Sequence, residues 1–137
     1  MRSVGGKSPI VDTRTKIIRA DQACALASGN RPLVLVTGHF DVLQAADVRD
    51  LRSVRDRFPG AILLVALVFP PEPLLATRAC AELAAALAMV DYVVSLDGEQ
   101  LAALMAALPS ACVVRLEPAQ QQRMRELTQH VRRRQSL

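Results

Sequence analysis

The chain has 137 residues, a net charge of +4, and 51% hydrophobic but only 3% aromatic residues, so its core must be built from aliphatic side chains. This length suits one domain with a single core. No apolar run approaches the ~20 residues of a membrane span, and the N-terminus lacks the apolar stretch of a signal peptide. We therefore expect a cytoplasmic protein with no membrane partner.

The cysteine spacing and the charge distribution narrow the kinds of site that the protein can contain. Cys24, Cys80 and Cys112 are widely spaced without a Cys-x-x-Cys pair, which argues against disulfides or a zinc site and favours buried, reduced thiols. Residues 1–19 carry five basic side chains against one Asp, and residues 117–137 carry five arginines against two Glu. The part between them is net negative, so the core shows no evident basic surface for a triphosphate.

The hydrophobic pattern alternates between helix and strand. The expected elements, after an irregular segment 1–15, are helix 21–28, strand 33–36, helix 44–58, strand 62–68, helix 76–88, strand 91–94, helix 99–108, strand 112–116 and a basic helix within 117–137. The run 62–68 is continuously apolar, which is typical of a strand buried on both faces of a parallel sheet. We predict an α/β fold, a Rossmann-like three-layer α/β/α sandwich with a mostly parallel sheet over residues 16–116.

The most informative motif begins where the first strand ends. Thr37-Gly38-His39-Phe40-Asp41 is followed by Gln44-Ala45-Ala46-Asp47, which opens the next helical pattern. A strand, a turn and a helix N-terminus in this order form a common phosphate site. The run resembles the signature of the cytidylyltransferase-like nucleotidyltransferases, in which Gly-x-Phe-Asp is followed by His-x-Gly-His.

The resemblance extends over roughly residues 16–116. Lys16-Ile17-Ile18, the helix after it, and the segment from Arg78 to Val90-Asp91-Tyr92-Val93-Val94 are similar to successive parts of the sugar-phosphate nucleotidyltransferases. The closest likeness is to the adenylyltransferase domain that activates heptose phosphate and to glycerol-3-phosphate cytidylyltransferase. It implies a nucleotidyltransferase-like domain at 16–116, followed by a basic C-terminal helix at 117–137.

The chemistry of that family is not retained. Its two histidines share one face of the first helical turn and neutralise phosphate charge. Here Gln44 supplies at most a neutral hydrogen bond, and Asp47 brings a negative charge that repels an anion at ~4 Å by roughly 4 kcal/mol. The loop at 69–73 also contains three prolines and no Lys, so it offers few N–H donors.

We therefore expect a catalytically inactive domain, with Gln44 and Asp47 as vestigial catalytic positions, no metal ligand and no certain cofactor; Mg²⁺ enters only if the protein is active. Arg78 and Arg115 are candidate substitutes for the missing Lys. The residues expected to bind a nucleotide or sugar phosphate are Thr37, Gly38, His39, Phe40, Asp41, Gln44, Asp47, Arg78 and Arg115.

Two site residues have simpler readings. An Asp in the first turn of a helix is favourable by roughly 0.3 to 1 kcal/mol without any ligand, so Asp47 is foremost a helix-start residue. His39 occupies the variable position of Gly-x-Phe-Asp, and we read it as a loop or rim histidine in preference to a replacement catalyst.

The C-terminal segment places Met124, Leu127 and Val131 at helical spacing among arginines. This stripe is expected to pack on the domain or on a twin subunit, which favours a homodimer. A basic helix that touches nucleic acid or anionic lipid is the alternative, although no recognition motif supports specific nucleic-acid binding.

The functional expectation is a nucleotide-binding or assembly domain. The alternatives are an active adenylyl- or cytidylyltransferase with altered catalytic residues, acting on a sugar or polyol phosphate, and a basic-tailed protein associated with nucleic acid.

Overall fold

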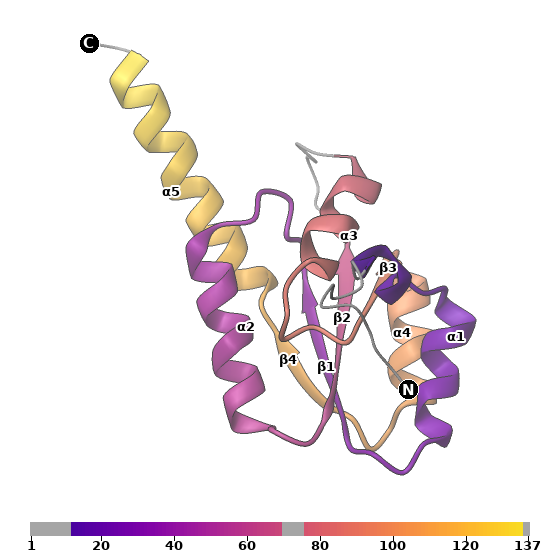
Figure 1. The fold of residues 1–137 in the computed structure, drawn as a ribbon. Helices are drawn as coiled ribbons and strands as arrows, with labels where there is room; N and C mark the ends of the chain where they lie inside the picture. Colours follow the sequence, from indigo (N-terminus) through magenta and orange to yellow (C-terminus); the bar gives the residue numbers. More distant parts are fainter. Residues whose placement is uncertain (1–11, 70–75, 136–137) are drawn as a thin grey trace, which may run out of the picture.

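The computed structural model describes residues 12–69 and 76–135, which form one parallel sheet with helices on both faces (Figure 1). The strands lie in the order β3-β2-β1-β4, with bounds β1 Leu33–Gly38, β2 Ile62–Val68, β3 Tyr92–Leu96 and β4 Cys112–Arg115. The helices are η1 Thr13–Lys16, α1 Ala20–Ala25, η2 Leu26–Ser28, α2 Ala45–Arg57, α3 Thr77–Ala85, α4 Gly98–Ala107 and α5 Glu117–Gln135. This architecture confirms the predicted Rossmann-like α/β fold.

Two aliphatic cores lie on opposite faces of the sheet. Alternate residues of the central strands point to opposite sides, so Val34 and Val36 join the core that contains residues of α2 and α3, whereas Leu35 joins the core that contains residues of α1 and α4. All six residues of β1 are buried, and so are the first six of β2. Burial on both faces explains why these strands read as continuous apolar runs.

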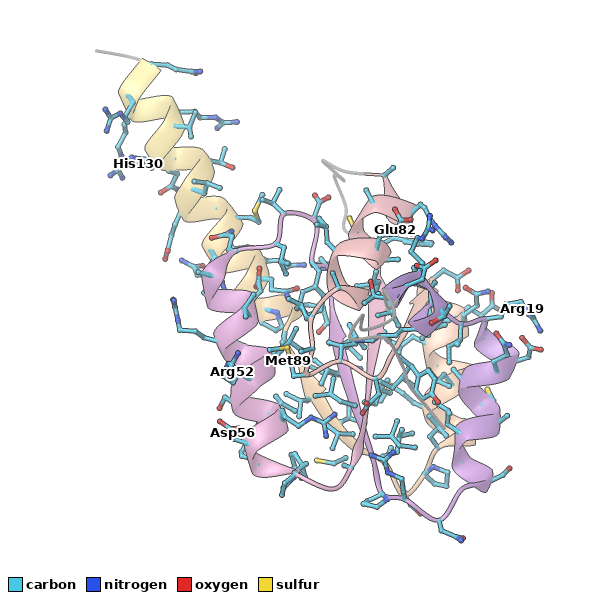
Figure 2. The ribbon with its side chains drawn as sticks, viewed as in Figure 1. Arg19, Arg52, Asp56, Glu82, Met89 and His130 are labelled. Atoms are coloured by element: carbon cyan, nitrogen blue, oxygen red, sulfur yellow. The ribbon has the colours of Figure 1, made fainter. Side chains whose placement is uncertain are left out.

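Arg55 fixes the C-terminal end of α2. Its guanidinium donates to the carbonyl oxygens of Ala61 (2.7 Å) and Met89 (3.0 Å) and to a carboxylate oxygen of Asp91 (2.7 Å). These contacts tie α2 to the segments that enter β2 and β3. Arg52 and Asp56 lie on the outer side of the same helix, as Figure 2 shows. Because the C-terminal end of α2 is held by these contacts, its N-terminus is positioned at the opposite end of the sheet.

Several boundaries differ from the sequence prediction. The helix expected over 76–88 ends at Ala85, because the following amides make turn hydrogen bonds, from Leu87 to the oxygen of Ala84 and from Val90 to that of Leu87. A segment at 1–15 was expected to be irregular, but its last residues belong to η1, which begins at Thr13. Residues 1–11 and most of the proline-rich loop at 69–73 lie outside the described residues. Among the residues described, no helix is both long and apolar enough to cross a membrane.

The sequence predicted that all three thiols are buried, and this prediction is wrong for Cys112 on edge strand β4. Cys80 is buried and Cys24 half-buried, but Cys112 is exposed. Among the described strands, β4 pairs with β1 alone, and its residue Val113 is also exposed (36%). The helices therefore leave part of this edge uncovered.

Helix α5 rises from the end of β4 and runs outward past the body of the domain (Figure 1). Gln120 is buried at its base, Met124 is half-buried, and every described residue from Arg125 onward is exposed. The stripe was expected to pack on the domain or on a twin subunit; Leu127 and Val131 are 41% and 45% exposed, so they do not pack on the described part of their own domain, and the twin subunit stays a prediction.

Candidate functional site

A pocket of about 470 Å³ opens between the turn after β1, the start of α2 and one face of α5. Its position at the carboxyl end of a parallel strand is where open α/β sheets form their ligand crevices, and its volume falls in the range of small-molecule sites. The lining residues come from the turn and helix start (His39, Phe40, Asp41, Val42, Gln44, Asp47) and from α5 (Gln120, Gln121, Met124, Arg125, Thr128, Gln129, Arg132).

The turn is shaped by an unusual backbone conformation at Phe40, whose φ is 48°. A non-glycine residue rarely adopts this left-handed region, so packing must hold it; the Phe40 side chain is only 2% exposed. The turn passes close to its neighbours at Gly38, where a Cβ atom would lie 2.5 Å from the Phe40 ring and 2.8 Å from Gln120 Oε1. Glycine is therefore required at position 38 by space.

The first two turns of α5 close over this turn. Gln120 Oε1 accepts hydrogen bonds from the backbone N–H groups of His39 (2.7 Å) and Phe40 (3.2 Å). One turn earlier, the buried Thr37 hydroxyl donates to Glu117 Oε2 at 2.7 Å. The donors at the end of β1 are thus satisfied from within the chain. The Gln120 side-chain nitrogen is buried and has no hydrogen-bond partner among the described residues.

Asp47 fills the N-terminus of α2. One carboxylate oxygen accepts from the Gln44 backbone N–H (2.8 Å), which caps the helix, and the other accepts from Arg123 of α5 (2.6 Å). Arg123 also contacts Asp50 at 3.1 Å. Burial opposes the Arg123 charge, but the hydrogen bonds and charges of Asp47 and Asp50 outweigh it and raise the pKa of Arg123. A side-chain anion thus occupies the position that a helix N-terminus offers to phosphate, and the helix-start reading of Asp47 is correct.

His39 is held by both ring nitrogens. Nδ1 lies 2.7 Å from the Val68 carbonyl oxygen, and because that oxygen can only accept, Nδ1 carries the proton. Nε2 lies 2.9 Å from the side-chain nitrogen of Gln121, which places Nε2 as the acceptor. Both ring nitrogens of His39 are therefore engaged by other residues of the chain. His39 and Gln44 nevertheless line one pocket, a convergence that the sequence left open.

The remaining predicted residues are divided between the pocket and other surfaces. Asp41 lines the pocket and lies near Cys80, whose thiol donates weakly to the Asp41 carbonyl (3.7 Å). Burial and the Asp41 charge raise the pKa of the Cys80 thiol, so it is a poor nucleophile. Arg78 pairs with Glu82 along α3 (3.6 Å), and Arg115 contacts Met105 Sδ (3.8 Å); neither lines the pocket.

The sequence missed the half of the site that α5 provides. Gln120 and Arg123 make the closest contacts with the turn and with α2, yet they lie about 80 positions from their partners. The glutamine run 120–122 between two charged stretches was the visible signal. The contacts of these glutamines depend on the tertiary structure, so their role could not be predicted from the sequence.

The α5 side of the pocket presents mainly polar and cationic groups. Two arginines, three glutamine amides and a threonine hydroxyl from α5 face a wall that contains Phe40 and Val42. Gln44 is directed to Met124 Sδ (3.6 Å). The fold and pocket define a Rossmann-like α/β domain with a crevice of mixed polar and apolar lining at the carboxyl end of its sheet. No protein-family model matches the sequence, and a search of curated proteins finds no match to it.

Proposed function

We propose that the chain is a catalytically inactive, nucleotidyltransferase-like domain that binds a phosphorylated ligand, a nucleotide or a sugar phosphate, and that it acts as a homodimer. One observation carries the proposal: the pocket at the carboxyl end of β1 contains the turn that resembles the nucleotidyltransferase signature, but the two positions where that family has histidine are used internally. Gln44 contacts Met124, and Asp47 is paired with Arg123.

The anion in this proposal is recognised at the α5 wall. Arg125 and Arg132 line the pocket, and the side chain of Asp47 is already neutralised by Arg123. Arginine donors suit phosphate because they present several N–H groups in a fixed plane. The apolar wall of Phe40 and Val42 provides area for the uncharged part of the ligand.

Calorimetric titration with ATP, CTP and a panel of sugar phosphates tests binding. Arg132→Gln removes one lining cation and is expected to weaken affinity about tenfold, the equivalent of one charge-assisted hydrogen bond. Arg133→Gln is the matched control, because the neighbouring residue is exposed and does not line the pocket. Equal affinities of the two variants, or no binding of any of these ligands to the unaltered protein, would refute the binding site.

Catalysis is tested separately by pyrophosphate release with Mg²⁺, ATP or CTP and the same sugar phosphates. We expect no release above background, because both ring nitrogens of His39 are engaged and the described pocket offers no second histidine. Turnover that Gln44→Ala abolishes would establish the alternative, an active nucleotidyltransferase with altered residues.

A further inference from the structure

The outer part of α5 carries an apolar stripe that is half-buried at Met124 and exposed at Leu127 and Val131 in the part of the chain that the structure describes. Met124, Leu127 and Val131 are separated by three and four residues, so they lie on one side of the helix. The same 3,4 spacing continues inward to Gln120, which packs on the domain, and outward to Arg134. The side of α5 that seats the helix on the domain therefore continues into solvent as Leu127 and Val131.

Charge is unevenly distributed along this helix. Its base lies beside acidic residues, since Asp41 and Asp47 share the pocket with it and Asp50 contacts Arg123. Its tip carries Arg132, Arg133 and Arg134, and no acidic residue follows Glu126 in the sequence. Figure 2 shows His130 on the part of the helix that is clear of the domain.

This charge pattern favours a second copy of the chain as the partner and an antiparallel arrangement of the two α5 helices. Two parallel helices would bring the basic tips together, and like charges in contact are destabilising. In an antiparallel pair, each basic tip lies beside the acidic base of the other copy. A second copy of this chain is thus complementary to the exposed stripe in both shape and charge.

We propose that the stripe of Met124, Leu127, Val131 and Arg134 packs antiparallel against the same stripe of a second copy, about a two-fold axis. Leu127 of each copy faces Val131 of the other, and Met124 faces the aliphatic stem of Arg134. The Arg134 guanidinium then reaches toward Asp50 of the other copy, whose side chain is 36% exposed. This deepens the homodimer in the proposed function by naming its surface, and it rests on that part of the proposal.

The interface is small, so the dimer is expected to be concentration-dependent. Residues 124–135 span about 18 Å at the α-helical rise, and each copy contributes only one helical face. Such contacts belong to the weak end of specific interfaces. We expect a dissociation constant on the order of micromolar, because the interface is small.

Sedimentation velocity of the full chain over a concentration series from about 1 to 300 μM tests the surface. The unaltered protein should shift from monomer to dimer, and Leu127→Glu should raise the dissociation constant at least tenfold by placing a charge in the stripe. Leu83→Glu is the matched control, because Leu83 on α3 is equally exposed (42%) but lies off the stripe. A monomer throughout, an unaffected Leu127→Glu variant, or an equal effect of both variants would overturn the proposal.

Cross-linking tests the direction in a Cys112→Ser background, which removes the exposed native thiol. An equimolar mixture of Leu127→Cys and Val131→Cys proteins should oxidise mainly to the mixed disulfide, because an antiparallel pair brings these two positions together. Predominant Leu127→Cys homodimers would indicate a parallel pair and overturn the proposal.

Two further readouts separate this inference from the rest. Leu127→Glu should leave nucleotide affinity within about twofold, because Leu127 does not line the pocket. A monomer that binds nucleotide would overturn the homodimer and its inferred surface but not the ligand site, and a dimer that binds none would overturn only the ligand site. A chain that stays monomeric yet retains a labelled oligonucleotide with a steep salt dependence would show that the basic tip meets nucleic acid, and would also overturn the proposal.

Discussion

The bond between Arg123 and the start of α2 should be a principal anchor of α5. Replacing Arg123 by Met keeps an apolar stem of similar length but leaves the Asp47 carboxylate, whose side chain is 3% exposed, without its cation. Breaking a buried ion pair on one side typically costs about 3 to 5 kcal/mol. Asp47 keeps the Gln44 N–H and the helix N-terminus, which offset roughly 1 kcal/mol. We expect Arg123→Met to lower the free energy of unfolding by about 2 to 4 kcal/mol.

Urea unfolding followed by far-UV circular dichroism measures this change. Arg125→Met is the matched control on the same helix. Arg125 is exposed and donates a hydrogen bond to Gln122, and its loss should change stability by less than about 0.5 kcal/mol. Asp47→Asn should partly relieve Arg123→Met, with a coupling energy of about 1 kcal/mol or more in the double variant. Strict additivity, or an Arg123→Met cost no larger than that of the control, would refute the buried-pair reasoning.

Further predictions concern space and titration. Gly38→Ala places a methyl group 2.5 Å from the Phe40 ring and should destabilise by about 1 to 3 kcal/mol in urea unfolding, whereas Gly60→Ala, with nothing within 4 Å, should be neutral or stabilising. In the native protein, a thiol reagent should modify the exposed Cys112 well before the buried Cys80, and Cys112→Ser should remove the fast phase. The raised pKa of Cys80 means that the unfolded chain loses this proton first, so the contribution of Cys80 to stability should be complete below about pH 8.5 and fall as pH rises, a slope that Cys80→Ala removes.

The strands and helices were largely predictable because local pattern and tertiary environment agree. Strand β2, Ile62–Val68, matches its predicted bounds, since a continuous apolar run has few uses other than a strand buried on both faces. Helix ends were less predictable. α3 ends three residues before its pattern does, because turn hydrogen bonds beyond Ala85 compete with the helix and the sequence carries no glycine or proline there to signal it.

Half of the candidate site could be predicted, namely the half that is contiguous in sequence. His39, Phe40 and Asp41 were placed by the strand, turn and helix order together with the motif that carries the family resemblance, and all three line the pocket. Gln120 and Arg123 were not, because a hydrogen bond across 80 positions depends on how far α5 crosses the sheet end, which no local pattern records. Asp47 shows the intermediate case: its helix-start role follows from position, but its pairing with Arg123 required the fold.

Strand order has a consequence for how the chain is made. β1 is the inner neighbour of β4, and Val34 pairs with Cys112, which follows it by 78 positions. During synthesis, β1, β2 and β3 are complete while the other side of β1 still presents bare amide and carbonyl groups. At ribosomal rates, the 19 residues from the end of β3 to the end of β4 take roughly 1 to 4 s. Over that interval a nascent chain offers a ready template for strand pairing with its neighbours on the same messenger, so slow translation of the codons for residues 97–115 should favour aggregation.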